Sequence, residues 1–206
     1  SYFFILFFSF FLFGINEFSL RLPAALFGII LVVMPLFLKE RMSYNKYMLS
    51  SFLLLSPSLM FYSRYSIHEA LFVLFSFAAI YLLTRIIEMK NLEYLPLFAI
   101  SLGILFTTKE TVIILGFIMV VICAVNYKEI RKIDWSDRNK ILLSVFLFLF
   151  LYIVLFSSFF TNLSGLNDSL KGYFPWTERG LTEKGHDKPF NYYFLLLSQY
   201  ELPLLL

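Results

Sequence analysis

Long uncharged apolar stretches constrain this sequence of 206 residues more than any other feature. Stretches of 12 to 20 residues without Asp, Glu, Lys or Arg recur between residues 2 and 160. Backbone polar groups inside a lipid bilayer must be satisfied within a helix or a closed barrel. Because these stretches lack the alternating pattern of barrel strands, the sequence predicts membrane helices.

Seven complete stretches can be bounded, and an eighth begins near the C-terminus. They are residues 2–14, 22–38, 47–62, 70–84, 95–106, 111–127 and 141–160, with the eighth starting at Phe190. We therefore expect an all-α, polytopic transmembrane helical bundle with about seven complete spans and the start of an eighth. Since one helix over residues 95–127 would be about 50 Å long, the polar break at 107–110 is expected to reverse the chain.

Composition excludes several other classes of protein. With 60% hydrophobic and only 15% charged residues, a soluble globular domain is excluded. The net charge of +3 is small, and the basic residues are divided among short loops, so no nucleic-acid partner is expected. Cys123 is the single cysteine, and we expect it to fill space in a helix.

The chain starts at Ser1, is apolar from the second residue and ends inside an apolar run. We therefore expect a single membrane domain over residues 1–206 that is a piece of a longer protein, with residues 161–189 as an outer loop within it.

Charges on alternate loops predict how the chain is oriented in the membrane. The first set of loops holds ten Lys or Arg against six Asp or Glu, a net charge of +4; it comprises residues 39–46, 85–93 and 128–140. The second set holds seven against eight, a net charge of −1; it comprises residues 16–21, 63–69, 107–110, 161–189 and Glu201. The positive-inside rule places the first set in the cytoplasm and the second set outside. We therefore expect an integral, multi-pass protein of the plasma membrane, with the second set of loops on its extracellular side. The inner loops also lack a Gly-rich phosphate loop, which an ATP-driven transporter or a kinase would need.

Two outer turns carry candidate substrate-binding residues. Residues 62–69 contain Arg64, His68 and Glu69 beside two tyrosines, which is richer than a simple turn requires. Lys109 and Glu110 follow a stretch of 12 residues, about 18 Å as a helix, and are expected to be recessed below the membrane surface.

The recessed turn suits an anion. A cap by Thr107 or Thr108 would start the next helix there, and a helix N-terminus beside a lysine is suited to bind phosphate. The alternative is a Lys–Glu pair that merely neutralises itself in a buried position.

Two pairs of residues are spaced to share a helix face, provided that a helix continues through them. The pairs are Glu17 with Arg21 and Arg64 with His68, each four residues apart. The alternative for the arginines is anchoring at phospholipid headgroups.

The outer loop supplies further candidates. Trp176, His186 and Lys188 lie in it, and Tyr192 and Tyr193 follow it. Its aromatic residues favour an ordered surface that stacks on a sugar or lies at the membrane interface. Asn162 and Asn167 each start a glycosylation sequon on the predicted outer side.

Three segments resemble one family of membrane enzymes. FGINEFSLRLPAALFG at 13–28, SPSLMFYSRY at 56–65 and TTKE at 107–110 resemble the second to sixth spans of C-type glycosyltransferases, the relatives of dolichyl-phosphate-mannose protein mannosyltransferases. GHDKPFNYY at 185–193, with Tyr200 and Glu201 beyond it, is most similar to the archaeal and bacterial branch named for its association with flippase activity in N-glycosylation.

The resemblance implies a chemistry. A sugar moves from a polyprenyl-phosphate donor to a glycan, lipid or protein acceptor on the outer face, and a carboxylate in the first outer loop acts as the base. That loop precedes the span at which this chain begins, so the catalytic residue stays unknown and the chain alone is expected to be inactive. In this scheme Arg64 and Lys109 stabilise the leaving phosphate, while Glu69, Glu110 or His186 orient the acceptor or hold those cations.

Several alternatives stay open at this point. No cofactor is certain, and a divalent metal is conceivable through His68, His186 and the carboxylates, although no compact ligand motif supports one. The other functions considered are a lipid-linked oligosaccharide flippase or transporter component, and a non-catalytic membrane scaffold. The outer polar turns are expected to converge on one aqueous cavity, because isolated charges at that depth would be costly.

Overall fold

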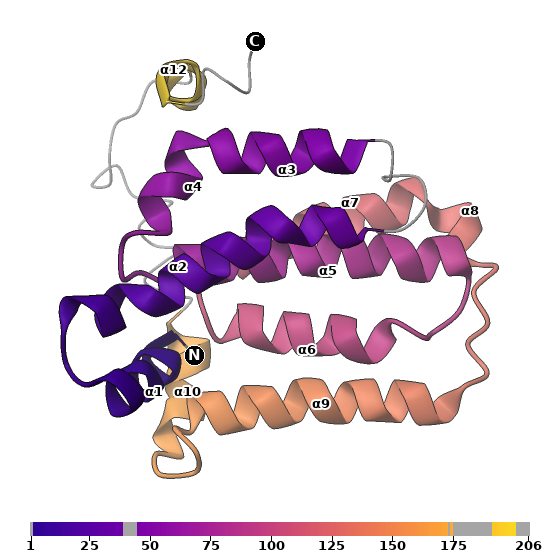
Figure 1. The fold of residues 1–206 in the computed structure, drawn as a ribbon. Helices are drawn as coiled ribbons and strands as arrows, with labels where there is room; N and C mark the ends of the chain where they lie inside the picture. The colour runs from indigo at the N-terminus through magenta and orange to yellow at the C-terminus, as the bar shows by residue number, and fades with distance from the viewer. Residues whose placement is uncertain (1, 39–44, 173, 175–190, 201–206) are drawn as a thin grey trace. The chain divides into compact units, whose positions relative to one another are not determined.

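The computed structural model describes residues 2–38, 45–172, 174 and 191–200; these residues form helices joined by turns and contain no β-strand. The helices are α1 (Tyr2–Phe13), α2 (Glu17–Val33), the 3-10 helix η1 (Met34–Phe37), α3 (Lys46–Leu55), α4 (Pro57–Tyr62), α5 (Glu69–Met89), α6 (Leu95–Phe106), α7 (Val112–Val125), α8 (Tyr127–Ile130), α9 (Arg138–Phe156), α10 (Ser164–Lys171) and α12 (Tyr192–Tyr200) (Figure 1).

The chain divides into two compact units. We call residues Phe75–Thr182 the central unit and residues Tyr2–Leu74 the N-terminal unit, with which the C-terminal residues from Glu183 are grouped. The boundary falls inside α5. The expectation of a single membrane domain stays a prediction.

All seven predicted apolar stretches are helical for most of their length, but not all are long single helices. Three segments are long and apolar enough to cross a membrane: Glu17–Phe37, Glu69–Met89 and Arg138–Phe156. Four apolar helices are shorter, namely α1, α3, α6 and α7. The all-helical membrane class is therefore confirmed for the described residues, while the number of spans stays a prediction.

The third predicted stretch, residues 47–62, is interrupted. Ser56 has extended backbone angles, its hydroxyl oxygen accepts a hydrogen bond from the amide of Leu59, and Pro57 occupies the first turn of α4. A Ser-Pro pair ends one helix and starts the next because proline cannot continue the hydrogen-bond ladder of α3. The expectation of one helix there was wrong, and the break sets α4 apart as a separate short helix.

A tight connection joins α1 to α2 in the N-terminal unit. Gly14 has a φ of 75°, a conformation that glycine adopts without strain, and it ends α1. Asn16 and Ser19 then cap each other's backbone amides at the start of α2. The hydroxyl of Ser9 also donates to the carbonyl of Ser19 at 2.7 Å, which holds α1 against α2.

Small residues let α2 lie close to α4 and α3. A Cβ atom placed on Gly28 would be 2.5 Å from Cβ of Ser63, so only glycine fits at this crossing. Nearby, the hydroxyl of Ser50 in α3 donates to the carbonyl of Val32 at 2.6 Å. Close approach over small residues is typical of helix pairs in membranes, where lipid provides no hydrophobic drive for helices to associate.

In the central unit, α6 and α9 form the most extensive contact between described helices. Gly103 lies against Leu151: a Cβ atom placed on Gly103 would be 3.1 Å from Cβ of Leu151. The rings of Phe106 and Phe148 meet edge to face at 5.7 Å. The two helices are therefore fixed along their length.

Two of the predicted inner loops meet at one end of the central unit. Ile86, Leu92 and Ile133 form a buried apolar cluster there. Beside it, Glu129 pairs with Lys90 at 3.3 Å and with Lys132 at 2.7 Å, and hydrogen bonds from these lysines lower the pKa of the Glu129 carboxyl. Since loops 85–93 and 128–140 share one end, the arrangement agrees with the alternation that the charges predict (Figure 1).

At its C-terminus, α9 ends in an unusual turn. Ser158, Phe159 and Phe160 all have left-handed backbone angles, with φ between 50° and 66°. Such a conformation costs roughly 1–2 kcal/mol per non-glycine residue. The buried Ser157 stabilises it, because its hydroxyl oxygen accepts from the amide of Phe160 at 3.0 Å and its carbonyl from the amide of Asn162 at 2.9 Å. The predicted stretch 141–160 therefore ends as a helix at Phe156, and the chain turns into α10.

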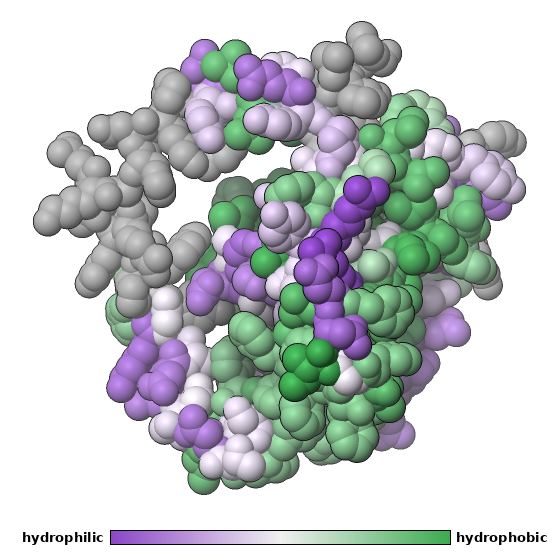
Figure 2. Space-filling model, turned by 60° about the vertical axis from the view of Figure 1, so that its left-hand side comes forward, coloured by the Kyte–Doolittle hydropathy of each residue, from purple (hydrophilic) through white to green (hydrophobic). Residues whose placement is uncertain are grey.

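The molecular surface agrees with a membrane environment. Figure 2 shows broad apolar areas on the face drawn, interrupted by hydrophilic patches. On α7, large apolar side chains such as Ile114, Phe117 and Val121 are exposed. Exposed apolar faces of this extent are expected where lipid covers a helix.

We predict that the two ends of the central unit lie on opposite sides of the membrane. In a variant lacking Cys123, single cysteines would replace Ser136 and Asn167, two exposed positions. A membrane-impermeant thiol reagent added to intact cells is expected to label position 167 and to label position 136 only after lysis. Labelling of position 136 but not of position 167 in intact cells would show that the chain has the opposite orientation.

The Gly28 contact gives a second prediction. Gly28→Ala is expected to destabilise the detergent-solubilised protein by about 1–3 kcal/mol, because the added methyl overpacks the contact with Ser63. Gly116→Ala is the matched control, since no described atom lies within 4 Å of a Cβ atom placed there and alanine favours a helix. Thermal unfolding checks both variants, and equal melting temperatures would show that α2 and α4 do not approach closely.

Candidate functional site

An arginine-containing pocket of about 700 Å³ lies in the N-terminal unit. Eight residues line this arginine pocket: Leu20, Arg21, Pro57, Met60, Phe61, Arg64, Tyr65 and Ser66. They come from the first turns of α2, from α4 and from the turn that follows α4. The pocket therefore depends on the two local features described above, the Asn16 cap and the Ser56-Pro57 break.

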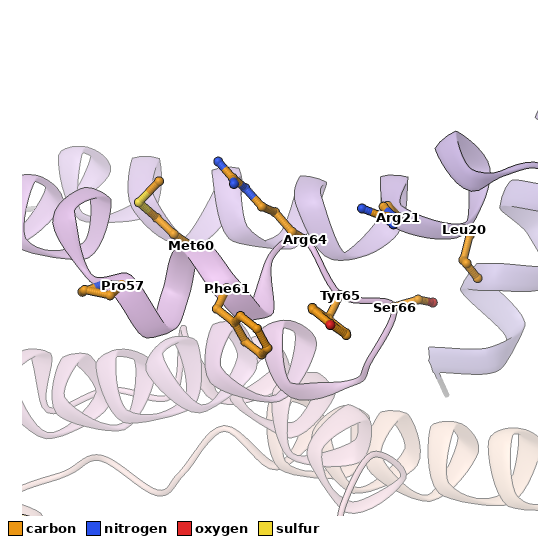
Figure 3. A pocket seen from close by; sticks show the side chains of 8 residues that line it. All are labelled: Leu20, Arg21, Pro57, Met60, Phe61, Arg64, Tyr65 and Ser66. Atoms are coloured by element: carbon orange, nitrogen blue, oxygen red, sulfur yellow. The ribbon is translucent and has the colours of Figure 1, made fainter. Parts of the chain in front are cut away.

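The turn after α4 presents its side chains in two directions. The rings of Phe61 and Tyr65 stack at 4.6 Å, and the hydroxyl of Tyr2 hydrogen-bonds that of Ser66 at 3.2 Å. Figure 3 shows the side chain of Arg64 on the other side of the turn from these two rings. These contacts hold the backbone of the turn that carries Arg64. The guanidinium of Arg64 is exposed and available to a ligand.

Arg21 is the second cation of this pocket. It pairs with Glu17 at 3.4 Å across one turn of α2, which confirms that these two residues share a helix face. Both side chains are exposed, so the pair is screened by solvent and contributes little to stability. The Arg21 guanidinium can therefore exchange this partner for a ligand at small cost.

An apolar groove of about 450 Å³ adjoins the arginine pocket. Its walls are the small and aliphatic residues of α2, α3 and α4, together with the turn that follows α4: Ala25, Gly28, Ile29, Val32, Val33, Leu53, Leu54, Leu59, Met60, Ser63 and Arg64. Met60 and Arg64 line both cavities. Arg64 therefore stands where a cationic pocket meets an apolar groove.

His68 and Glu69 lie just beyond the arginine pocket. The imidazole Nε2 of His68 is 3.9 Å from Oε1 of Glu69, and both side chains are partly exposed. Because α4 ends at Tyr62 and α5 begins at Glu69, no helix carries Arg64 and His68 on a common face. The condition for a shared face, a helix that continues through both residues, is therefore not met for this pair.

A separate pocket of about 300 Å³ lies in the central unit, at the end opposite the inner loops. We call it the threonine–lysine pocket; it is lined by Phe106, Thr107, Thr108, Lys109, Glu110, Phe156, Gly165, Asp168, Ser169 and Gly172. It brings the turn between α6 and α7 together with the end of α9 and with α10. Lys109 is half-buried and Glu110 is exposed. Their depth below the membrane surface stays a prediction.

The two threonines of this turn do not cap α7. The hydroxyls of Thr107 and Thr108 instead donate to the carbonyl of Ile104, at 2.9 and 2.6 Å, and so complete the C-terminus of α6. Thr111 precedes α7 and makes no side-chain capping hydrogen bond. The predicted threonine cap was wrong, because each hydroxyl found a nearer acceptor in the preceding helix.

The remaining predicted residues are only partly covered. Trp176, His186 and Lys188 lie outside the described residues. Tyr192 and Tyr193 are in the first turn of α12. Within the described part of the chain, no group of three or more His, Cys, Asp or Glu side chains is placed to hold a metal ion. Since Arg64 and Lys109 belong to different units, their convergence on one cavity stays a prediction.

Sequence reasoning missed two features. Arg85 was counted as a loop charge, but it lies in α5 with only 3% of its surface exposed, near Glu88 at 3.3 Å and the ring of Tyr94 at 5.7 Å. Asp168 and Ser169 were not singled out as site residues, although the amphipathic pattern of residues 164–171 is a signal for the helix that carries them.

A family model matches this chain. The model described as dolichyl-phosphate-mannose-protein mannosyltransferase matches residues 1–158, which include both arginines of the arginine pocket and most of the helices described above. No curated protein and no solved structure matches the chain significantly. Because the match covers most of the sequence and agrees with the apolar helices, this chain belongs to the dolichyl-phosphate-mannose-protein mannosyltransferase family.

Proposed function

We propose that this protein transfers a sugar from a polyprenyl-phosphate donor to an acceptor at the outer face of the plasma membrane. Membership of the family implies a membrane glycosyltransferase that uses a lipid-linked sugar donor. The polyprenyl carrier, the outer face and the plasma membrane are finer assignments that belong to the proposal. They are supported by the charge distribution of the loops and by the chemistry of the arginine pocket.

The position of Arg64 carries the proposal. A lipid-phosphate sugar combines a compact anion with a long apolar chain, and Arg64 lines both the arginine pocket and the apolar groove. Guanidinium groups bind phosphate oxygens through paired hydrogen bonds, and Arg21 supplies a second group in the same pocket. We assign the phosphate to these two arginines and the first isoprene units to the groove.

The two cavities contribute differently to binding. A prenyl chain that leaves bilayer hydrocarbon for an apolar groove gains little free energy, since both surroundings are equally apolar. The groove therefore orients the donor, and the charged end supplies most of the affinity. As the sugar departs, the phosphate gains negative charge, and a cation fixed beside it stabilises the transition state more than the ground state.

Arg64 is a stronger candidate for this role than Lys109. Among the described residues, two cations and no carboxylate line the arginine pocket, whereas the lining of the threonine–lysine pocket includes Glu110 and Asp168. Those carboxylates offset the charge of Lys109 and disfavour an anion. We assign His68 and Glu69, next to the arginine pocket, to orienting the acceptor or the arginine.

We also propose that the chain belongs to the archaeal and bacterial branch named for its association with flippase activity in N-glycosylation. The support is the pattern GHDKPFNYY at residues 185–193, most of which lies outside the described residues.

The arginine assignment gives a prediction for the full-length protein in its native membrane. Arg64→Met is expected to lower the rate of sugar transfer roughly 30- to 1000-fold, corresponding to about 2–4 kcal/mol of lost transition-state stabilisation. Arg64→Lys is expected to retain part of the activity, because it keeps the charge and loses the paired hydrogen bonds. The measurement is release of labelled sugar from its lipid carrier, normalised to the amount of protein.

The matched control is Arg138→Met, an exposed arginine at the start of α9, on the predicted inner side. It removes one positive charge near the membrane and is expected to leave the turnover within about twofold of wild type. Equal turnover in the Arg64 and Arg138 variants would remove the assigned role of Arg64.

A further inference from the structure

The threonine–lysine pocket differs in charge from the arginine pocket. Its lining includes one ammonium, from Lys109, and two carboxylates, from Glu110 and Asp168, so its net charge is −1 when all three are ionised. A phosphate would meet net repulsion there. A neutral ligand rich in hydroxyl groups would instead find both acceptors and a donor.

Aromatic rings complete this lining. Phe106 comes from the end of α6 and Phe156 from the end of α9. Phe156 ends a series of rings along α9, with Tyr152 at 4.7 Å and Phe148 a further 6.2 Å from Tyr152. The apolar face of a sugar ring packs against such rings while its hydroxyls reach polar groups at the edge.

The pocket is held in place by specific contacts. The hydroxyl of Tyr152 hydrogen-bonds that of Ser169 at 2.6 Å, which ties α10 to α9. Gly165 is packed so closely against the backbone carbonyl of Phe156 that a Cβ atom at this position would clash with its oxygen. The left-handed turn at residues 158–160 brings α10 back to this position. The fold thus maintains a strained turn and a close glycine contact beside the pocket.

We propose that the threonine–lysine pocket binds a sugar ring, with Asp168 and Glu110 accepting its hydroxyl groups and Lys109 donating to them. This inference rests on the proposed function, because it names a sugar subsite for that reaction. The sugar is either the one carried by the donor or one on a glycan acceptor, since both present the same hydroxyl groups. The experiment below separates the two sources.

The test uses Asp168→Asn in the protein in its native membrane. Asp168 is exposed, and its backbone carbonyl accepts the amide of Gly172, a bond that the substitution preserves. Loss of a charged hydrogen-bond acceptor is expected to raise the KM of the sugar-bearing substrate about tenfold. If the KM for the donor rises, and rises also when the donor is slowly hydrolysed without acceptor, the pocket binds the donor sugar. If only the KM for the acceptor rises, the pocket binds a sugar of the acceptor glycan. Glu110→Gln is expected to act in the same direction, while Glu93→Gln, an exposed carboxylate of the opposite loop, is the control.

A second readout separates this inference from the phosphate assignment. Sugar-free polyprenyl phosphate is used as an inhibitor, and its inhibition constant is expected to stay within about twofold of wild type in Asp168→Asn but to rise in Arg64→Met. If both KM values are unchanged in Asp168→Asn and Glu110→Gln, the sugar site is wrong. If inhibition by polyprenyl phosphate instead becomes clearly stronger in Asp168→Asn, because a carboxylate beside the anion has been removed, the pocket is a phosphate site. Absence of inhibition in the wild type would contradict the proposed function, whatever the Asp168 variant does.

Discussion

The length of its apolar helices is the constraint on which the rest of this structure depends. A helix of 12 residues such as α6 is about 18 Å long and ends short of the surface of a hydrocarbon core about 30 Å thick. We therefore expect the polar turn after it to lie below the membrane surface, where charged groups are stable only beside partners or water. Between α6 and α7 this turn forms one wall of the threonine–lysine pocket. In the proposed scheme, helix length sets the depth of these polar groups.

In the proposed scheme, the two pockets bind different parts of a lipid-linked sugar. One has two arginines beside an apolar groove, and the other has two carboxylates, a lysine and two aromatic rings. An anion with a prenyl tail suits the first, and a neutral polyhydroxyl ring suits the second. The charges of the two linings have opposite signs, and this difference indicates which ligand each pocket prefers more clearly than the pocket volumes do.

Much of the fold was predictable from hydrophobicity alone. Helix type follows from runs of uncharged residues, because lipid leaves no other way to satisfy the backbone, and the reversal at 107–110 follows from length. The break at Ser56 was missed because serine and proline are both tolerated inside apolar stretches. Only the hydrogen bond from the Leu59 amide to the Ser56 side chain shows that a new helix begins there. Helix α10 was missed because its eight mostly polar residues resemble a loop in composition, although their spacing is amphipathic.

The charged residues of the two sites could be predicted from the sequence, but the residues that pack around them could not. Arg64 and Lys109 were identified because charged side chains at the ends of apolar helices are costly unless they bind a partner or a ligand. The apolar groove beside Arg64 depends on the close approach of Gly28 to Ser63, residues 35 apart in the chain, which no local pattern indicates. In the same way, burial of Arg85 under Tyr94 arises from packing that the run of charges around it does not indicate.

Mapping where the prenyl chain of the donor binds would test whether the apolar groove and Arg64 hold the lipid-linked donor. A polyprenyl phosphate with a photoreactive group in its first isoprene unit would be cross-linked in membranes, and the labelled peptides identified by mass spectrometry. The account predicts cross-links in the groove, at residues 25–33 of α2 and at Leu53, Leu54 and Leu59, which disappear when unlabelled donor is added. Saturable cross-links confined to the exposed faces of α7 or α9, with none in the groove, would contradict it.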